Sequence, residues 1–290
     1  MRADGFGRGG GGTVRLVATD LDGTIVRSDG TVSARTVAAL NRAERAGARV
    51  VLVTGRPPRL MAPIAAAFGH RGTAICSNGA FRYDLRTGAV TAERAIPADV
   101  LAEAATRLRA AVPGIGLAVE YAHGLAADPW YEAGEWDADT VVDRVGDGEL
   151  FGRAAPKLLG RHATLGADEL LARARPALDG LVTAYHSNGE RLVEAIGLKV
   201  SKAEALAELA AEHGIGPAET VAFGDMPNDL PMLAWAGRSY AVAGAHPEVL
   251  AAADEVVGGN DADGVAEVLE GLFGGGEQGA GPGASGGGGA

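Results

Sequence analysis

The feature that most constrains the fold is a repeated alternation of short apolar runs with helix-like segments, in which each run ends at a polar motif. Val14–Thr19 is a largely apolar run that ends at Asp20, and Arg49–Val53 is the next one. Runs of this kind are typical of strands buried on both faces, as in a parallel sheet. Between the two runs, Ser33 can cap a helix that reaches about Ala46. The pattern therefore predicts parallel strands joined by crossover helices.

The same pattern returns later in the chain, in three further apolar runs: Thr73–Cys76, Thr220–Phe223 and Ser239–Val242. Strands joined by helices in this way form an α/β fold, a doubly wound parallel sheet of the Rossmann-like kind. Ligands of such sheets bind beyond the carboxyl ends of the strands. The polar motifs that follow the runs are therefore the candidates for a functional site.

The segment 83–189 breaks this rhythm. Its helix and strand patterns are short and irregularly spaced, and they lie at Ala98–Ala111, Ile115–Glu120, Lys157–Leu159, Asp168–Leu178 and Leu181–His186. We expect an α+β cap domain, inserted into a sheet domain made of residues 14–82 and 190–273. The ends, 1–13 and 274–290, are rich in glycine. We expect disordered tails there, because such segments bury too little apolar surface to offset their ordering entropy.

Composition argues against several classes of function. Hydrophobic residues make up 47% of the 290 residues, enough for a sizeable core, and the net charge of −11 argues against a nucleic-acid partner. A small phosphorylated substrate is compatible with this charge, because a bound divalent cation reverses its local sign. No apolar run is long enough to span a bilayer, and Cys76 is the single cysteine, so no intrachain disulfide can form. We expect a cytoplasmic protein without a membrane partner, in which Cys76 is buried.

Asp20 and Asp22 stand at the exit of the first predicted strand. Strand alternation places their side chains on the same side as the chain leaves the sheet. A carboxylate can attack phosphorus when a cation neutralises the phosphate oxygens, and a second acid can exchange protons with the leaving oxygen and with water. A calcium loop has the same start, but it needs glycine and glutamate where this chain has Ile25 and Thr31. On their own, the two acids also fit a turn or a helix cap.

Two further motifs carry groups that suit a phosphate. Thr54, Gly55 and Arg56 follow the second strand, where a hydroxyl and backbone N–H groups can bind phosphate oxygens, although Thr-Gly is also common in turns. Lys202 opens a predicted helix, a position that is unfavourable for a cation because the helix N-terminus is already positive. A nearby anion would explain the lysine.

Asp225 and Asp229 are candidate metal ligands. Asp225 ends the strand that begins at Thr220, and Asp229 lies one helical turn further on. Together with Asp20 they offer hard oxygen atoms, which Mg²⁺ prefers in combination with water and phosphate oxygens. The histidines have no pair at helix-face metal spacing, which disfavours zinc.

The segment Asp128–Glu149 mixes aromatic and acidic residues, among them Trp130, Tyr131, Glu132, Glu135, Trp136, Asp137, Asp139 and Asp143. One interpretation is a solvated acidic loop with packed aromatic rings. The other is a cap loop that offers ring faces and carboxylates to sugar hydroxyls. Its negative charge would then disfavour highly anionic substrates such as bisphosphates.

Together these motifs resemble the haloacid dehalogenase (HAD) superfamily of phosphatases, over residues 14 to 273. The Val-Ser-Lys helix start, the Gly-Asp-x-x-Asn-Asp signature and the length of the cap are similar to the Cof-like, type IIB subgroup. The resemblance implies that Asp20 is a nucleophile that forms an aspartyl-phosphate, and that Asp22 is the general acid and base.

The resemblance also implies a Mg²⁺ site. Its ligands would be Asp20, the backbone carbonyl of Asp22, and Asp225, with Asp229 as a ligand or just behind one. The residues that would contact the phosphate or the substrate are Thr54, Gly55, Arg56, Asn78, Lys202 and Asn228.

The expected function is that of a Mg²⁺-dependent phosphatase for a small phosphorylated metabolite, such as a sugar phosphate. A phosphomutase on the same scaffold is one alternative, because it differs in returning the phosphoryl group to the substrate. A catalytically silent binding protein is another, which the joint presence of Asp20, Asp22 and Lys202 disfavours. Cap loops set specificity, so the motifs define the reaction rather than the leaving group or the oligomeric state.

Overall fold

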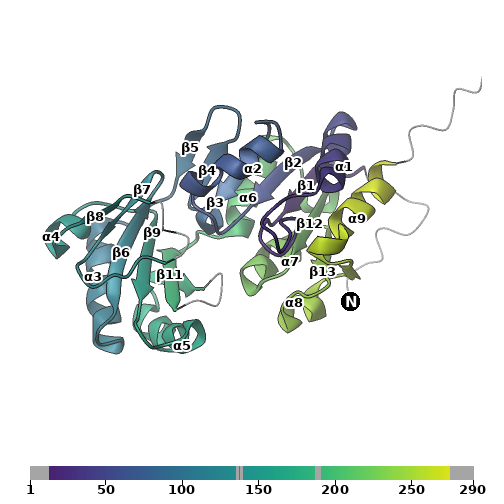
Figure 1. The fold of residues 1–290 in the computed structure, drawn as a ribbon. Coiled ribbons are helices and arrows are strands. Elements are labelled where there is room, and N and C mark those ends of the chain that lie inside the picture. The colour runs from purple at the N-terminus through teal and green to yellow at the C-terminus, as the bar shows by residue number, and fades with distance from the viewer. Residues whose placement is uncertain (1–12, 135–136, 138–139, 187–190, 275–290) are drawn as a thin grey trace, which may run out of the picture.

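The computed structural model describes residues 13–134, 137, 140–186 and 191–274, which form two sheets with helices packed on them (Figure 1). Apart from Thr13 and Gly274, the predicted tails lie outside the described residues. Among the residues that are described, no helix combines the length and the apolar character needed to cross a membrane.

The larger sheet confirms the predicted doubly wound α/β arrangement. Its strand order is β14-β13-β12-β1-β2-β3-β4-β5, and the pairs from β14 to β3 are parallel. The strands are β1 (Leu16–Thr19), β2 (Arg49–Val53), β3 (Thr73–Cys76), β4 (Phe81–Asp84), β5 (Ala89–Glu93), β12 (Thr220–Gly224), β13 (Arg238–Val242) and β14 (Glu255–Val257). All four side chains of β1 are buried, and each large apolar one contributes about 1.5–3 kcal/mol of stability. Cys76 at the end of β3 is buried, as predicted.

Helices connect these strands and cover the sheet (Figure 1). They are α1 (Ala34–Arg45), α2 (Ala62–Ala67), α6 (Lys202–Glu212), α7 (Leu230–Trp235), α8 (Pro247–Ala252) and α9 (Gly264–Phe273). The start of α1 follows from its sequence, because the Ser33 side chain accepts a hydrogen bond from the N–H of Thr36. Its buried stripe includes Ala39, Leu40 and Ala43 at helical spacing, and α1 packs against α9.

The second sheet has the order β10-β11-β9-β6-β7-β8. Its strands are β6 (Gly116–Tyr121), β7 (Gly124–Ala127), β8 (Val142–Arg144), β9 (Lys157–Arg161), β10 (Val182–Tyr185) and β11 (Leu192–Gly197). Helices α3 (Ala98–Ala111) and α5 (Ala167–Leu178) pack together over it, and α4 (Asp147–Leu150) precedes β9. The core formed by the helices and this sheet includes Leu101, Leu117, Leu158, Leu170 and Val193. We call this part of the molecule the cap.

The sheets divide the chain at different residues than expected. Strands β4 and β5, which end at Glu93, pair with β3 in the larger sheet, and β11, which begins at Leu192, pairs in the cap sheet. The cap boundaries expected at 83 and 189 are therefore corrected to the stretches just after β5 and just after β11. The physical reason is that β4 alternates buried and half-buried side chains, as in a one-sided strand, and lacks the continuous apolar run used to identify the parallel strands.

Candidate active site

The carboxyl ends of three neighbouring strands bring three of the predicted residues together. Strand β1 lies between β12 and β2, so Asp20 follows β1 at the same edge of the sheet where Asp225 follows β12 and Thr54 follows β2. The N–H of Asp20 still donates to the carbonyl of Phe223 at 3.0 Å, which extends the β1–β12 pairing into the site. The three residues therefore lie together at the edge of the sheet where ligands of such folds bind.

Gly23 makes the close approach of the first and last motifs possible. Its φ is +82°, and a Cβ at this position would lie 2.3 Å from Oδ2 of Asp225. The next residue, Thr24, donates from its hydroxyl to Oδ1 of Asp225 at 3.0 Å. Only glycine fits this turn, because any side chain would displace the Asp225 carboxylate.

Lys202 is the cationic centre of the site. Its ammonium lies 2.6 Å from Oδ1 of Asp20 and 2.6 Å from Oδ1 of Asp229, and all three side chains are buried. It opens α6, where the hydroxyl of Ser201 caps the helix by accepting from the N–H of Glu204. Burial alone would lower the pKa of Lys202, but the two carboxylates outweigh it and hold that pKa above its usual value. The lysine is therefore charged at neutral pH, and the anions anticipated near this helix start are Asp20 and Asp229.

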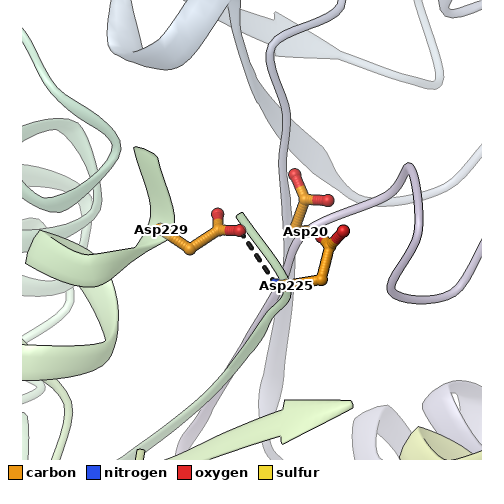
Figure 2. Close-up of side chains that lie close together, drawn as sticks. All are labelled: Asp20, Asp225 and Asp229. Atoms are coloured by element: carbon orange, nitrogen blue, oxygen red, sulfur yellow. Dashed lines mark hydrogen bonds between the residues drawn. The ribbon is translucent and has the colours of Figure 1, made fainter. Parts of the chain in front are cut away.

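Asp20, Asp225 and Asp229 each offer an oxygen within 4.8 Å of the others (Figure 2). Both oxygens of Asp229 are already engaged, since Oδ1 faces Lys202 and Oδ2 accepts from the N–H groups of Asp225 and Met226 at 3.1 and 3.0 Å. Asp229 is thus placed to hold the lysine and the strand end in position. Asp20 and Asp225 are the carboxylates that face each other across the site.

The electrostatics of these two carboxylates fit a cation. Burial raises the pKa of Asp20 well above its ordinary value, although Lys202 opposes the shift. Burial and the charge of Asp229 raise the pKa of Asp225 to about 6. Two buried acids side by side repel each other when both are ionised, and a divalent cation with oxygen ligands removes this cost. The donor set therefore fits a divalent metal ion.

Arg56 links the first two motifs. Its guanidinium donates to both oxygens of Asp22, from Nε at 2.8 Å and from Nη2 at 2.5 Å. Its backbone N–H donates to the hydroxyl oxygen of the fully buried Thr54 at 3.0 Å. The Thr54 hydroxyl therefore accepts from the loop and can direct its own proton toward a ligand oxygen.

Asn78 and Asn228, both expected to face the substrate, meet each other. The amide of Asn228 donates to Oδ1 of Asn78 at 3.0 Å. Asn78 has a left-handed φ of 53°, and its N–H donates to the carbonyl of Thr54 at 3.0 Å. The following Gly79 packs against the start of α6, where a Cβ would lie 2.4 Å from the carbonyl oxygen of Ser201. This loop therefore bridges the second motif and the lysine helix.

A cavity of about 340 Å³ opens above these groups, between the strand ends and the cap. It is lined by Asp20, Asp22, Gly55, Arg56, Asp225 and Asn228 from the larger-sheet side. Of the remaining residues predicted to bind substrate, Asn78 and Lys202 line a second cavity of about 420 Å³, which shares Asn228 with the first, and Thr54 is fully buried. The size of the first cavity suits a small metabolite.

The cap side of the cavity holds charged residues that the sequence analysis missed. Lys157 donates to Glu194 at 2.7 Å, lies 3.2 Å from Glu120, and contacts the carbonyl oxygen of Gly55 at 3.3 Å. Arg59 bridges from the larger-sheet side to Glu120 at 2.9 Å and to Asp137 at 2.8 Å. A signal was present: Glu120, Lys157 and Glu194 are isolated charges in apolar strands, and a charge is rarely buried unless it is paired.

In the acidic and aromatic segment 128–149, some residues fit the interpretation as a packed, solvated loop and others fit the interpretation as a loop that faces the substrate. Asp128 is fully buried and accepts from the N–H groups of Leu117, Trp130 and Tyr131, so it has a structural role. Trp130 is 68% exposed, whereas Tyr131 and Asp137 line the cavity. Glu135, Trp136 and Asp139 lie outside the described residues.

Comparison with known proteins adds a family to this geometry. Residues 17–128 and 138–269 match the model of a haloacid dehalogenase-like hydrolase. The chain is 32% identical to a phosphoglycolate phosphatase of Halorubrum lacusprofundi, over 87% of this chain and 95% of that protein. It is 26% identical to the pyridoxal phosphate phosphatase YbhA of Escherichia coli, over 89% and 98%. A solved phosphatase of this superfamily from Bacteroides thetaiotaomicron superimposes with a TM-score of 0.77 at 25% identity, over 93% and 99%.

Proposed function

The chain belongs to the haloacid dehalogenase-like hydrolases as a Cof-like phosphatase of phosphoric monoesters, and within that family we propose that it hydrolyses a small phosphorylated metabolite, a sugar phosphate or similar monoester, with Mg²⁺ and through an aspartyl-phosphate on Asp20. The observation that carries the proposal is the contact between the buried Asp20 and Lys202, at 2.6 Å, beneath a cavity of metabolite size. In the proposed reaction, Lys202 would lie beside the carboxylate that attacks and beside the charge that develops on the phosphoryl oxygens.

In the first step, an oxygen of Asp20 bonds to phosphorus while the bond from phosphorus to the ester oxygen breaks. Asp22 gives its proton to the departing oxygen. In the second step, Asp22 takes a proton from a water molecule whose oxygen attacks phosphorus, which releases inorganic phosphate and restores Asp20. Arg56 holds both oxygens of Asp22, so this ion pair has to open for Asp22 to carry a proton.

The residues that would hold Mg²⁺ are Asp20, Asp225 and the backbone carbonyl of Asp22. When bound, the ion supplies positive charge to the phosphoryl oxygens. Asp229 holds Lys202 and the N–H groups after β12 in place, and this supports a role in positioning the metal ligands rather than in binding the metal itself. Thr54 and Lys202 would bind the remaining phosphoryl oxygens.

The test is phosphate release from a panel of monoesters with Mg²⁺ and with EDTA. The named relatives suggest including phosphoglycolate and pyridoxal phosphate beside sugar phosphates. We expect release from at least one of these monoesters with Mg²⁺, loss of that release with EDTA, and a loss of about 10³-fold or more in Asp20→Asn, because the nucleophile is gone. Undiminished release by Asp20→Asn would refute the covalent mechanism. Transfer to a second position of the substrate without release would instead favour a phosphomutase, and binding without either reaction would favour a silent binding protein.

A further inference from the structure

Strand alternation sorts the cap sheet into two chemically different faces. On β6, β9 and β11, one set of alternate residues, including Val119, Leu158 and Val193, packs under the cap helices. The other set includes Glu120, Lys157 and Glu194, and it lines the catalytic cavity. The sequence of the cap strands therefore decides which groups the leaving group of a substrate meets.

The charges on this side of the cavity cancel. Three cations and three anions line it: Arg59, Lys157 and Arg161, and Glu120, Asp137 and Glu194. Glu120 accepts from both Arg59 and the hydroxyl of Ser77, at 2.9 and 3.1 Å, and Lys157 lies between Glu120 and Glu194. A second anionic group on a substrate could therefore pair with Arg59 or Lys157 only by displacing one of these carboxylates.

The carboxylates also restrict what can bind next to them. An ionised carboxylate only accepts hydrogen bonds, so Glu120 and Glu194 can bind a hydroxyl, which donates, and cannot bind a carboxylate or a phosphate, which only accept. Leu60, Leu159 and Leu192 line the same cavity and suit the C–H faces of a carbon chain. An uncharged leaving group that carries hydroxyls can donate hydrogen bonds to the carboxylates and pack its C–H groups against the leucines.

We propose that Glu120 and Glu194 select substrates whose leaving group is uncharged and carries hydroxyls, and reject those whose leaving group carries a second anion. This inference rests on the proposed phosphatase function and names the chemical class of its substrate. Asp20 and its neighbours act on the phosphate that every monoester shares, whereas the two glutamates contact the leaving group, which differs between substrates.

A matched pair of substrates tests the inference without any mutation. Glycerol 3-phosphate and 3-phosphoglycerate differ in one terminal group, a CH₂OH in the first and a carboxylate in the second. We expect kcat/KM of the wild-type protein with Mg²⁺ to be about tenfold or more higher for glycerol 3-phosphate. Equal or higher kcat/KM for 3-phosphoglycerate would overturn the inference.

Variants then assign the selectivity to the two residues. In Glu194→Gln and in Glu120→Gln, Lys157 keeps one carboxylate partner, and we expect the preference for glycerol 3-phosphate to fall by about tenfold because an amide can donate to an anion. Glu169→Gln is the matched control, since Glu169 is an exposed residue of α5 paired with Arg173, and its preference should equal that of the wild type. An unchanged preference in both cavity variants would refute the assignment.

p-Nitrophenyl phosphate separates this inference from the proposed function. Hydrolysis of this compound by the wild type, together with no discrimination between the matched pair, would overturn the selectivity and leave the phosphatase mechanism in place. No hydrolysis of any monoester would overturn the proposed function and the selectivity with it.

Discussion

Replacing Lys202 with methionine removes a charge that both Asp20 and Asp229 contact at 2.6 Å. The two carboxylates then stay buried with exposed side-chain fractions of 7% and 0%. At an effective dielectric constant of about 20, an ion pair about 4 Å apart contributes about 4 kcal/mol of attraction. Part of this loss is offset because the lysine no longer has to be desolvated, so we expect a net loss of about 3–5 kcal/mol in the free energy of unfolding at pH 8.

The pH dependence of this loss has a definite sign. Burial raises the pKa of Asp20, and Lys202 is the group that opposes the rise, so in Lys202→Met that pKa moves further up. A carboxyl group with a raised folded-state pKa destabilises the fold as the pH rises above its unfolded-state pKa. The loss should therefore be largest at pH 8 and shrink as the pH is lowered toward 4, where the acids of the variant become protonated.

The assay is urea unfolding of both proteins without metal, followed from pH 4 to pH 8 and extrapolated linearly to water. Arg107→Met is the control, because it removes one cation from the exposed helical pair with Glu103 and should cause a much smaller loss with little pH dependence. Phosphate release by Lys202→Met should fall by about 10²–10³-fold, as expected when a group that stabilises transition-state charge is removed. A loss of stability below about 1 kcal/mol at pH 8, or one that does not vary with pH, would refute this account of the site.

Two further predictions concern backbone geometry and a surface ion pair. In Gly23→Ala the new Cβ would meet Asp225, so phosphate release should fall by about 100-fold. Gly30 has a nearly equal φ of +81° but open space around it, so Gly30→Ala should lose stability through backbone strain and lose no activity. Equal activities of the two variants would contradict the steric argument. In Asp263→Asn the left-handed backbone (φ 58°) is retained but the ion pair with Arg27 is lost. Although burial opposes the shift, the ion pair with Arg27 lowers the pKa of Asp263. The variant should therefore be less stable than the wild type in thermal unfolding at pH 7, and equally stable once the pH falls below the folded-state pKa of Asp263. A difference in stability that persists at low pH would point to another cause.

The sequence predicted which residues meet at the strand ends better than it predicted the contacts within the cap. Apolar runs ending in Asp20, Thr54 and Asp225 define strand ends, and parallel pairing brings strand ends together regardless of the residues between them. The partners of Glu120 and Lys157 could not be derived in this way, because cap register depends on which strands pair across long and irregular connections. The register sets Lys157 directly opposite Glu120, and no local pattern in either strand specifies that alignment.

The position of β1 has a consequence for synthesis on the ribosome. This strand is made long before β12, with which it pairs on one side, and Lys202 is 182 residues away from Asp20 along the chain. Until β12 emerges, β1 presents one unpaired apolar edge, of the kind that promotes association between chains. A stalled nascent chain that ends within the cap would therefore carry Asp20 without Lys202, and would be both inactive and prone to aggregate.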